Sequence, residues 1–265
     1  MKKEKQQYIA SISYGKDSLA MLEVIKENNL PLDRIITCDI WATPTIRAEY
    51  PEEIEFRKKA DKIIKERYGI EVEHIRAEKS FEEQLYTKFT RGKKVGKIYG
   101  YPNRVANWCN KALKVIPLDN VTTKSNIVYV GLAADEESRV KRLPHNKIAP
   151  LYEYKITEEQ AMKICEKLDL LNPIYSLFGR GGNCWFCCNA NLNWLRCNYH
   201  YYPKYWELMK KWESDSENKR IWNINHTLED YEKRFIAEEK GLVPMDRTFR
   251  WKMLEELEGK NDSII

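Results

Sequence analysis

The segment with the clearest chemistry in this sequence is SYGKDS, residues Ser13–Ser18, which lies between an apolar run and a stretch with helical spacing. Backbone N–H groups at the start of a helix, together with the helix dipole, favour a bound phosphate. The hydroxyls of Ser13 and Ser18 and the ammonium of Lys16 can add hydrogen-bond donors and positive charge. The four-residue spacer of a Walker A loop is absent. The segment therefore predicts a phosphate-binding loop of another kind, the alternative being a polar turn before a helix.

The cysteines form a second candidate site. Cys184 and Cys187 are separated by two residues, the spacing with which a tight turn presents two thiolates to one metal ion. Gly181 and Gly182 precede them and would let the backbone wrap around the metal. Two thiolates are half of a four-ligand site, so the other ligands must come from elsewhere in the chain. The alternative is that these cysteines are buried apolar side chains, which seldom show this spacing.

The basic residues are unevenly distributed along the chain, although the net charge of +5 is small. No Asp or Glu occurs between Gln84 and Leu118. This imbalance indicates a surface that faces an anion, such as a nucleic acid or a small anionic substrate. A solvated loop is the alternative. The basic residues of the segment are Lys88, Arg91, Lys93, Lys94, Lys97, Arg104, Lys111 and Lys114.

The elements that would position these groups alternate between strand and helix in the first half of the chain. Short apolar runs predict strands, and apolar residues at helical spacing predict helices. Strands separated by helices imply right-handed βαβ units, and therefore an α/β fold with a doubly wound, mostly parallel sheet. Ligands of such a fold bind at the carboxyl ends of the strands. We expect strands at 8–13, 34–39, 70–75 and 126–131, and helices at 18–28 and 45–68, the latter interrupted near Pro51.

The second half of the chain has a helical character. A capping box at Thr157–Gln160 predicts a helix that runs to about Leu170. Three further helices are expected near 203–214, 228–240 and 249–258. We therefore place a domain boundary near Tyr154, with a nucleotide-binding domain at 1–154 and a helical subdomain containing the cysteine motif at 155–265.

The composition is that of a folded chain, since 43% of the 265 residues are hydrophobic and only 11 are Gly and 10 are Pro. No apolar run approaches the roughly 18 residues that a membrane span requires. The N-terminal MKKEKQQ leads directly into a strand-like run, without the apolar core of a signal peptide. We therefore expect a soluble cytoplasmic protein with no membrane partner, in which the cysteines remain thiols.

These segments resemble the PP-loop ATP pyrophosphatase superfamily, which has a Rossmann-like fold, and within it the phosphoadenosine phosphosulfate reductase family with its phage-borne and mobile-element branches. The loop of the superfamily usually has the sequence SGGKDS, whose first glycine is replaced here by Tyr14. The similar segments occur in the order of the family over most of residues 8–212. They are Ser13–Ser18, Asp39–Pro44, Trp108–Lys111 with Leu113 and Lys114, Gly131–Arg139 and Cys184–Cys187.

The resemblance implies that the chain binds ATP and Mg²⁺. In similar proteins the segment after the fourth strand closes on the nucleotide, and lysines at the positions of Lys111 and Lys114 face a phosphate or sulfate. The catalytic residues that the resemblance implies are Lys16, Asp17, Lys111 and Arg139. The nucleotide-binding residues that it implies are Ser13, Tyr14, Gly15, Lys16, Asp17, Ser18, Asp39, Gly131, Asp135 and Glu136.

The resemblance also implies a metal centre. In iron–sulfur members of the family, a cysteine at the position of Cys109 joins the later pair. The fourth ligand would be Cys197 or Cys188, of which we favour Cys197. The implied ligands of a [4Fe–4S] cluster, with zinc as the alternative metal, are then Cys109, Cys184, Cys187 and Cys197.

Similar enzymes activate a substrate by adenylation, release pyrophosphate and transfer sulfur from a donor such as a cysteine desulfurase. Reductases of the family instead use a cysteine in a C-terminal Glu-Cys-Gly-x-His motif, and no cysteine follows Cys197 in this sequence. The resemblance therefore favours an ATP-dependent adenylating sulfurtransferase. One alternative is a sulfonucleotide reductase. The other is a non-catalytic nucleotide-binding module stabilised by a metal, and the variant residue Tyr14 leaves this second alternative open.

Overall fold

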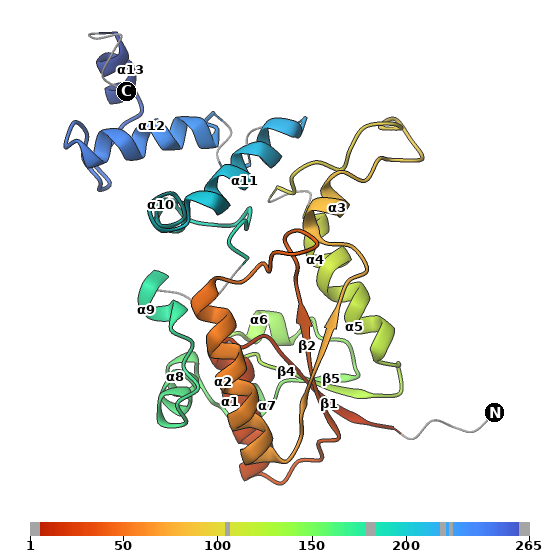
Figure 1. Cartoon of the computed structure of the whole chain (residues 1–265). Helices are drawn as coiled ribbons and strands as arrows, with labels where there is room; N and C mark the ends of the chain where they lie inside the picture. Colours follow the sequence, from red (N-terminus) through yellow and green to blue (C-terminus); the bar gives the residue numbers. More distant parts are fainter. Residues whose placement is uncertain (1–5, 104–106, 179–183, 218–220, 223–224, 260–265) are drawn as a thin grey trace. The chain divides into compact units, whose positions relative to one another are not determined.

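The computed structural model describes residues 6–103, 107–178, 184–217, 221–222 and 225–259 (Figure 1). Gly181 and Gly182, which were expected to shape the cysteine turn, and Arg104 of the basic segment lie outside these residues. The chain forms two compact units, described separately below. The first unit comprises Met1–Phe81 and Trp108–Cys184, and the second comprises Glu82–Asn107 and Trp185–Ile265.

The boundary that we expected near Tyr154 falls inside the first unit. The helix with the expected capping box, α8 (Glu158–Lys167), packs against α1 (Lys16–Glu27). Its capping box is formed as predicted, because the Thr157 hydroxyl accepts from the backbone N–H of Gln160 and the Gln160 side chain accepts from the backbone N–H of Thr157. Residues 155–184 thus belong to the same compact unit as the SYGKDS loop.

A sheet of five parallel strands forms the centre of the first unit, in the order β3-β2-β1-β4-β5 (Figure 1). This sheet confirms the predicted α/β fold. The chain adds β2 and β3 on one side of β1 and then β4 and β5 on the other. The point where the order reverses lies between β1 and β4, and ligands of such sheets bind in the crevice outside the strand ends there. The strands are β1 (Tyr8–Ile12), β2 (Arg34–Asp39), β3 (Val72–Arg76), β4 (Ile127–Val130) and β5 (Lys147–Ile148).

Helix α1 holds the loop-bearing end of β1 in place through its apolar face. Leu19 and Leu22 of α1 are completely buried in a core that also contains Phe56 of α2 (Pro51–Tyr68) and Cys165 of α8. Burial of each leucine side chain contributes about 1.5–3 kcal/mol to stability. The start of α1, immediately after the SYGKDS loop, is therefore fixed by packing on both sides.

Helix α2 (Pro51–Tyr68) begins at the proline and not at residue 45 as predicted. The residue before a proline disfavours helical backbone, whereas proline itself is well suited to the first helical position. The preceding segment turns back along the end of β2, where the Ala48 N–H donates to the Ile40 carbonyl at 2.9 Å. This return places Arg47 and Glu49 beside the carboxyl end of β2.

The remaining helices of the first unit are short and were not expected from sequence. A π-helical turn, η1 (Lys111–Val115), lies between two of them. Such wide turns inside helices occur often at functional sites. The short helices are α4 (Trp108–Asn110), α5 (Ile116–Val121), α6 (Glu137–Val140), α7 (Pro150–Glu153) and α9 (Ile174–Phe178), and α3 (Phe81–Leu85) connects the units in sequence.

The second unit is helical, as predicted, and has a core of aromatic side chains. Trp185, Trp206 and Trp212 are almost completely buried, and the rings of Trp185 and Trp212 stack with centroids 5.4 Å apart. None of the described helices is long and apolar enough to cross a membrane. The helices of this unit are α10 (Leu192–Tyr201), α11 (Pro203–Asp215), α12 (Leu228–Glu239) and α13 (Lys252–Glu258).

Gly131, just after β4, approaches the first turn of α1 too closely for any side chain. A Cβ atom at this position would lie 2.6 Å from the backbone nitrogen of Ser18 and 2.7 Å from its Cα atom. Both contacts are with backbone, which a side-chain rotation cannot relieve. Gly131 therefore sets the distance between β4 and the loop.

We expect Gly131→Ala to lower the free energy of unfolding by about 3 kcal/mol, at the upper end for overpacking, because strand and helix must separate. Urea denaturation would measure the change. Gly69→Ala is the matched control, since Gly69 has a φ of 71° and no atom within 4 Å of the added Cβ. The free energy of unfolding of the control should fall by only about 1–2 kcal/mol, the cost of an alanine in left-handed backbone. Equal losses would contradict the close approach.

Candidate active site

The SYGKDS loop is closed by hydrogen bonds of its own residues. The Ser18 hydroxyl accepts from the backbone N–H of Ser13 at 3.1 Å and donates to the Gly15 carbonyl at 2.9 Å. Helix α1 then starts with the N–H of Leu19 donating to the Gly15 carbonyl at 3.1 Å. The Ser18 hydroxyl thus shapes the loop, whereas the Ser13 hydroxyl lies at its edge, 3.4 Å from the Ser18 oxygen.

Tyr14, which replaces a glycine of the usual loop sequence, has left-handed backbone with a φ of 57°. Its side chain is completely buried and points away from the loop toward α2 and β3. The hydroxyl donates to the Asp61 carboxylate, and the Arg57 guanidinium lies 4.8 Å from the ring centroid. Burial, reinforced by the Asp61 carboxylate, raises the pKa of Tyr14, so its hydroxyl remains a donor. The bulky residue therefore anchors the loop without filling it.

Asp39, at the end of β2, is surrounded by positive charge. Arg47 donates to both of its oxygens, at 2.7 and 3.0 Å, and Arg57 lies 3.4 Å away. The Nδ1 atom of His74 lies 3.0 Å from the carboxylate. Burial alone would raise the pKa of Asp39, but His74 and Arg47 outweigh it and lower this pKa. The structure thus places Asp39 in an ion network behind the loop, and its expected role in nucleotide binding stays a prediction.

His74 connects this network to Tyr14. Its two ring nitrogens lie against Asp39 and Asp61, at 3.0 and 3.2 Å. Hydrogen bonds to these two carboxylates raise the pKa of His74 to about 9, although partial burial opposes the shift. The imidazolium is therefore retained at neutral pH, where it bridges β2, β3 and α2.

Lys16 is held by two carboxylates. Its Nζ atom lies 2.8 Å from Asp17 and 2.9 Å from Glu158, and its side chain is only 8% exposed. Burial disfavours the ammonium, but the two carboxylates outweigh burial and raise the pKa of Lys16. Its backbone N–H donates to the hydroxyl of Tyr175 at 3.1 Å. Glu158 and Tyr175 were not identified as site residues from sequence, since Glu158 belongs only to the capping box and Tyr175 belongs to no motif.

The segment after β4 reaches the same place. Asp135 accepts from the backbone N–H of Glu158 at 3.3 Å, and Glu136 accepts from that of Ala133 at 3.2 Å. Glu136 also forms an ion pair with Arg139. Burial raises the pKa of Asp17, Lys16 opposes this shift, and the charges of Glu158 and Glu136 add to it. The structure therefore brings the predicted residues of the loop and of this segment together around the start of α8.

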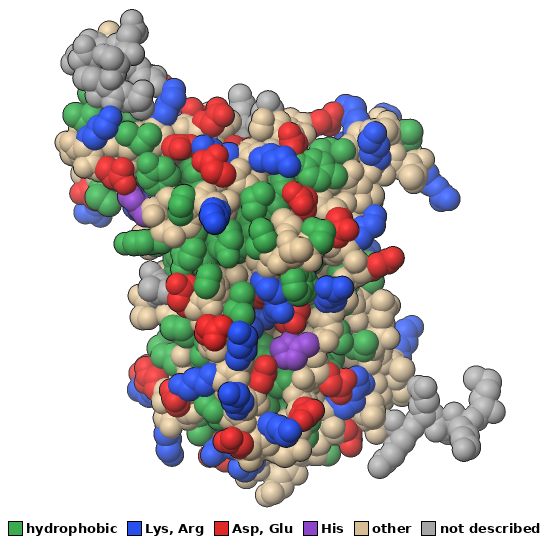
Figure 2. Space-filling view, in the orientation of Figure 1, with side chains coloured by type: hydrophobic (Ala, Val, Ile, Leu, Met, Phe, Trp, Pro, Cys, Tyr) green, Lys and Arg blue, Asp and Glu red, His purple; other side chains and the backbone are tan. Residues whose placement is uncertain are grey.

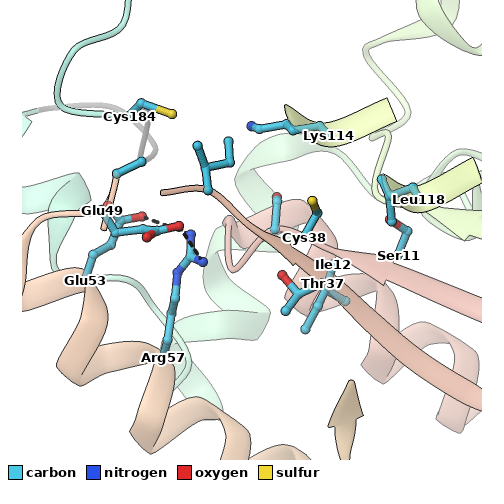
Figure 3. A pocket seen from close by; sticks show the side chains of 13 residues that line it. Ser11, Ile12, Thr37, Cys38, Glu49, Glu53, Arg57, Lys114, Leu118 and Cys184 are labelled. Atoms are coloured by element: carbon cyan, nitrogen blue, oxygen red, sulfur yellow. Dashed lines mark ion pairs between the residues drawn. The ribbon is translucent and has the colours of Figure 1, made fainter. Parts of the chain in front are cut away.

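A cavity of about 200 Å³ opens at the carboxyl ends of β1 and β2 (Figure 3). Ser13 of the loop forms part of its lining, and the side chains of Lys114 and Cys184 point into it. Lys114 thus lines the cavity, whereas Lys111, on the same π-helical turn, is exposed and does not. Burial raises the pKa of Cys38, another lining residue, to about 11, so this thiol remains protonated at neutral pH.

One wall of the cavity carries charged groups that the sequence analysis did not identify. Arg57 forms ion pairs with Glu49 at 2.8 Å, and Glu53 is only 3% exposed. Burial raises the pKa of Glu53. Among the described atoms, the Oε2 of Glu53 and the Nε of Arg57 have no hydrogen-bond partner. This wall therefore offers polar groups to a ligand, and these residues were missed because charges on a helix usually indicate a solvent-exposed face.

The four predicted metal ligands are divided between the units. Cys109 and Cys184 belong to the first unit, and Cys187 and Cys197 belong to the second. All four are partly exposed, whereas Cys188 is buried. In the part of the chain that the structure describes, no group of three or more potential metal ligands gathers. Their role as a metal site stays a prediction.

The phosphoadenosine phosphosulfate reductase domain family matches residues 7–165, which is more than half of the chain. The chain belongs to this family. The match includes the SYGKDS loop, all five strands and most of α8, and it ends before Cys184. The match thus contains Lys16, the loop and the acidic residues after β4, but of the four predicted metal ligands it contains only Cys109.

Other comparisons add little to the family assignment. Among solved structures, the chain is similar to the U34-tRNA thiolase NcsA from Methanococcus maripaludis with its [4Fe-4S] cluster. The sequences are 19% identical, and the alignment covers 80% of this chain and 72% of the thiolase, with a TM-score of 0.39. Similarity at this level does not establish that the two proteins share a function. A search of curated proteins gave no match.

Tyr14→Gly restores the usual loop sequence and relieves the left-handed strain of about 1–2 kcal/mol. We nevertheless expect a net loss of about 2–4 kcal/mol in the free energy of unfolding, because the variant leaves a cavity in the core. Tyr14→Phe keeps the ring and should lose only about 1 kcal/mol with its hydrogen bond. Tyr201→Phe is the control, since Tyr201 is 75% exposed. A Tyr14→Gly variant as stable as wild type would contradict the anchoring role.

Proposed function

We propose that this chain is an ATP-dependent adenylating enzyme of the sulfurtransferase type. The observation that carries the proposal is that Ser13 belongs both to the SYGKDS loop and to the lining of the cavity. A phosphate chain on the loop would therefore continue directly into the cavity. Family membership supports an adenine nucleotide as the ligand. The acceptor would be an anionic molecule or a nucleic acid, and the sulfur would come from a donor such as a cysteine desulfurase.

In the proposed reaction, the loop amides and the start of α1 bind the terminal phosphates of ATP. Lys16 exchanges its carboxylate partners for phosphate oxygens and stabilises the charge of the leaving pyrophosphate. A substrate oxygen attacks the α-phosphorus, the bond to the bridging oxygen breaks, and pyrophosphate leaves. A sulfur nucleophile then displaces AMP from the adenylated substrate. Lys114 and the polar wall of the cavity would orient the reacting groups.

Mg²⁺ would supply further charge neutralisation for the phosphates. Carboxylate oxygens are the ligands that it prefers, and the carboxylate charges around Lys16 fit that chemistry. Asp17 is the residue best placed to hold it, because Glu136 and Glu158 are near enough to raise its pKa. Phosphate oxygens that attract Lys16 would also release Asp17 for the metal.

A second candidate function is sulfonucleotide reduction, which the description of the matching family favours. This reaction would use the same loop and cavity for the nucleotide. A thiol would attack the sulfate sulfur of an adenylyl sulfate and displace AMP. A second thiol would then attack the sulfur of the S-sulfonated thiol, which forms a disulfide and releases sulfite. A third candidate is nucleotide binding without turnover. The products formed separate these three.

Lys16→Ala should reduce pyrophosphate release from ATP by about 100-fold, because Lys16 stabilises the leaving group. The assay would offer ATP and sulfide with RNA or without it, and would measure AMP and pyrophosphate. Lys163→Ala is the control, since Lys163 is on the exposed face of α8 and pairs with Glu159. Formation of ADP would contradict adenylation, thiol-dependent sulfite release from an adenylyl sulfate would support reduction, and tight ATP binding without products would support a binding module.

We further propose that Cys109, Cys184, Cys187 and Cys197 bind a [4Fe–4S] cluster, with zinc as the alternative. Thiolates are the preferred ligands of both metals. Cys109 and Cys184 belong to the first compact unit, and Cys187 and Cys197 belong to the second. The described residues do not gather three of these ligands, and the reaction proposed above contains no step at a cluster.

We expect protein purified without oxygen to contain iron and acid-labile sulfide, both of which are lost in Cys184→Ala/Cys187→Ala. Cys38→Ala, outside the proposed ligand set, should keep them. Cys188→Ala distinguishes between Cys197 and Cys188 as the fourth ligand. The variant should keep its full metal content if Cys197 is the ligand and should lose metal if Cys188 is. Stoichiometric zinc would identify the other metal, and protein without metal would contradict the proposed centre.

A further inference from the structure

Residues 86–100 of the second unit, which we call the basic arm, form a loop between α3 and α4 whose two halves meet in an antiparallel bridge at Lys88 and Ile98 (Figure 1). The N–H of Phe89 donates to the Lys97 carbonyl at 2.9 Å, and the N–H of Tyr99 donates to the Thr87 carbonyl at 2.9 Å. These hydrogen bonds link the outgoing and the returning halves of the arm. The arm therefore has a defined backbone structure.

The base of the arm is anchored in the core of the second unit. The N–H of Gly100 donates to the Leu85 carbonyl at 3.0 Å. The next residue, Tyr101, is buried. Its backbone N–H donates to the Ser216 hydroxyl at 2.7 Å, and its own hydroxyl donates to the Phe186 carbonyl at 2.7 Å. The side chains of the arm are thus presented from a fixed base.

The arm is strongly and uniformly positive. Within the described residues of the segment between Gln84 and Leu118 there is no carboxylate, and the tip from residue 90 to 97 is exposed throughout. Lysine and arginine side chains gather over this part of the surface (Figure 2). Of the arm's cations, the described residues provide a carboxylate partner only for Lys97, which lies 2.5 Å from Glu217. The cations are Lys88, Arg91, Lys93, Lys94 and Lys97.

Aromatic rings lie among these charges. The rings of Phe89 and Tyr99 stack with centroids 4.4 Å apart, and Tyr99 is 37% exposed. The Nζ atom of Lys94 lies 5.8 Å from the centroid of the Phe89 ring. An exposed aromatic edge beside several cations can take a base on its face while the cations take the phosphates on either side. An acidic protein surface would use the cations but would have no need of the stacked rings.

We propose that the basic arm binds single-stranded nucleic acid, with its cations on the phosphates and a base against the Phe89–Tyr99 stack. The proposal deepens the proposed function, since it names the class of acceptor, and only its relevance to catalysis rests on that function. Single strands are favoured over duplexes because the rings need an unpaired base. Binding itself requires neither ATP nor the SYGKDS loop.

The test is fluorescence anisotropy of labelled 20-nucleotide RNA and DNA, single-stranded and duplex, titrated with the full chain at several salt concentrations. Lys93→Ala/Lys94→Ala should weaken single-strand binding at least about tenfold at low salt and reduce the salt slope by about 1.4, from about 0.7 per lost phosphate contact. Lys58→Ala/Lys163→Ala is the matched control, since both lysines are exposed on helices of the first unit. Equal weakening by the control would overturn the assignment to the arm.

Tyr99→Ala tests the aromatic contribution. It should weaken single-strand binding about fivefold or more without changing the salt slope, because it removes stacking and not charge. Equal affinity for duplexes, no effect of Tyr99→Ala, or tighter binding of polyglutamate than of nucleic acid would each overturn the proposal. Circular dichroism would verify that the variants fold.

The two proposals can fail separately. Lys16→Ala should bind single strands like wild type, and the arm variants should bind ATP like wild type. Nucleic-acid binding without pyrophosphate release would support the arm and contradict the proposed reaction. Pyrophosphate release without nucleic-acid binding would do the opposite and would favour a small anionic acceptor.

Discussion

The left-handed turn at Tyr14 is the constraint on which the candidate site depends. The backbone must reverse between β1 and α1 within a few residues, and the side chain at the turn needs a space in which to pack. Here it enters the core, where Asp61 accepts its hydrogen bond and Arg57 lies over its ring. The loop is therefore held from behind by the sheet and by α2. A bulky residue can replace glycine because its side chain is buried in the core and does not line the cavity.

The second feature is a balance of charge around Lys16. Its ammonium is buried between Asp17 and Glu158, and the segment after β4 adds Glu136 nearby. Such an arrangement neutralises a buried cation and still leaves it able to bind another anion, since phosphate oxygens can replace the carboxylates. Asp39 differs, because it is surrounded by Arg47, Arg57 and His74 and serves to hold β2, β3 and α2 together.

Much of the fold could be predicted from sequence, because its signals are local. Apolar runs located the four longer strands, and the capping box at Thr157 located α8, whereas β5 is too short to show a pattern. The partners in the site could not be predicted, since Lys16 and Glu158 are 142 residues apart and only the fold brings them together. The direction of the Tyr14 side chain was hidden for the same reason. The polar wall of Glu49, Glu53 and Arg57 was missed because charges on a helix usually indicate a solvent-exposed face. The loop itself could be found because its residues are contiguous.

The most direct test of this account is a crystal structure of the chain with the α,β-methylene analogue of ATP, whose α–β bridge cannot be cleaved. We expect the β- and γ-phosphates against the backbone of Ser13–Ser18, the Nζ atom of Lys16 moved from Asp17 and Glu158 to phosphate oxygens, and the Tyr14 ring unchanged. An analogue bound elsewhere, with both ion pairs of Lys16 intact, would contradict it.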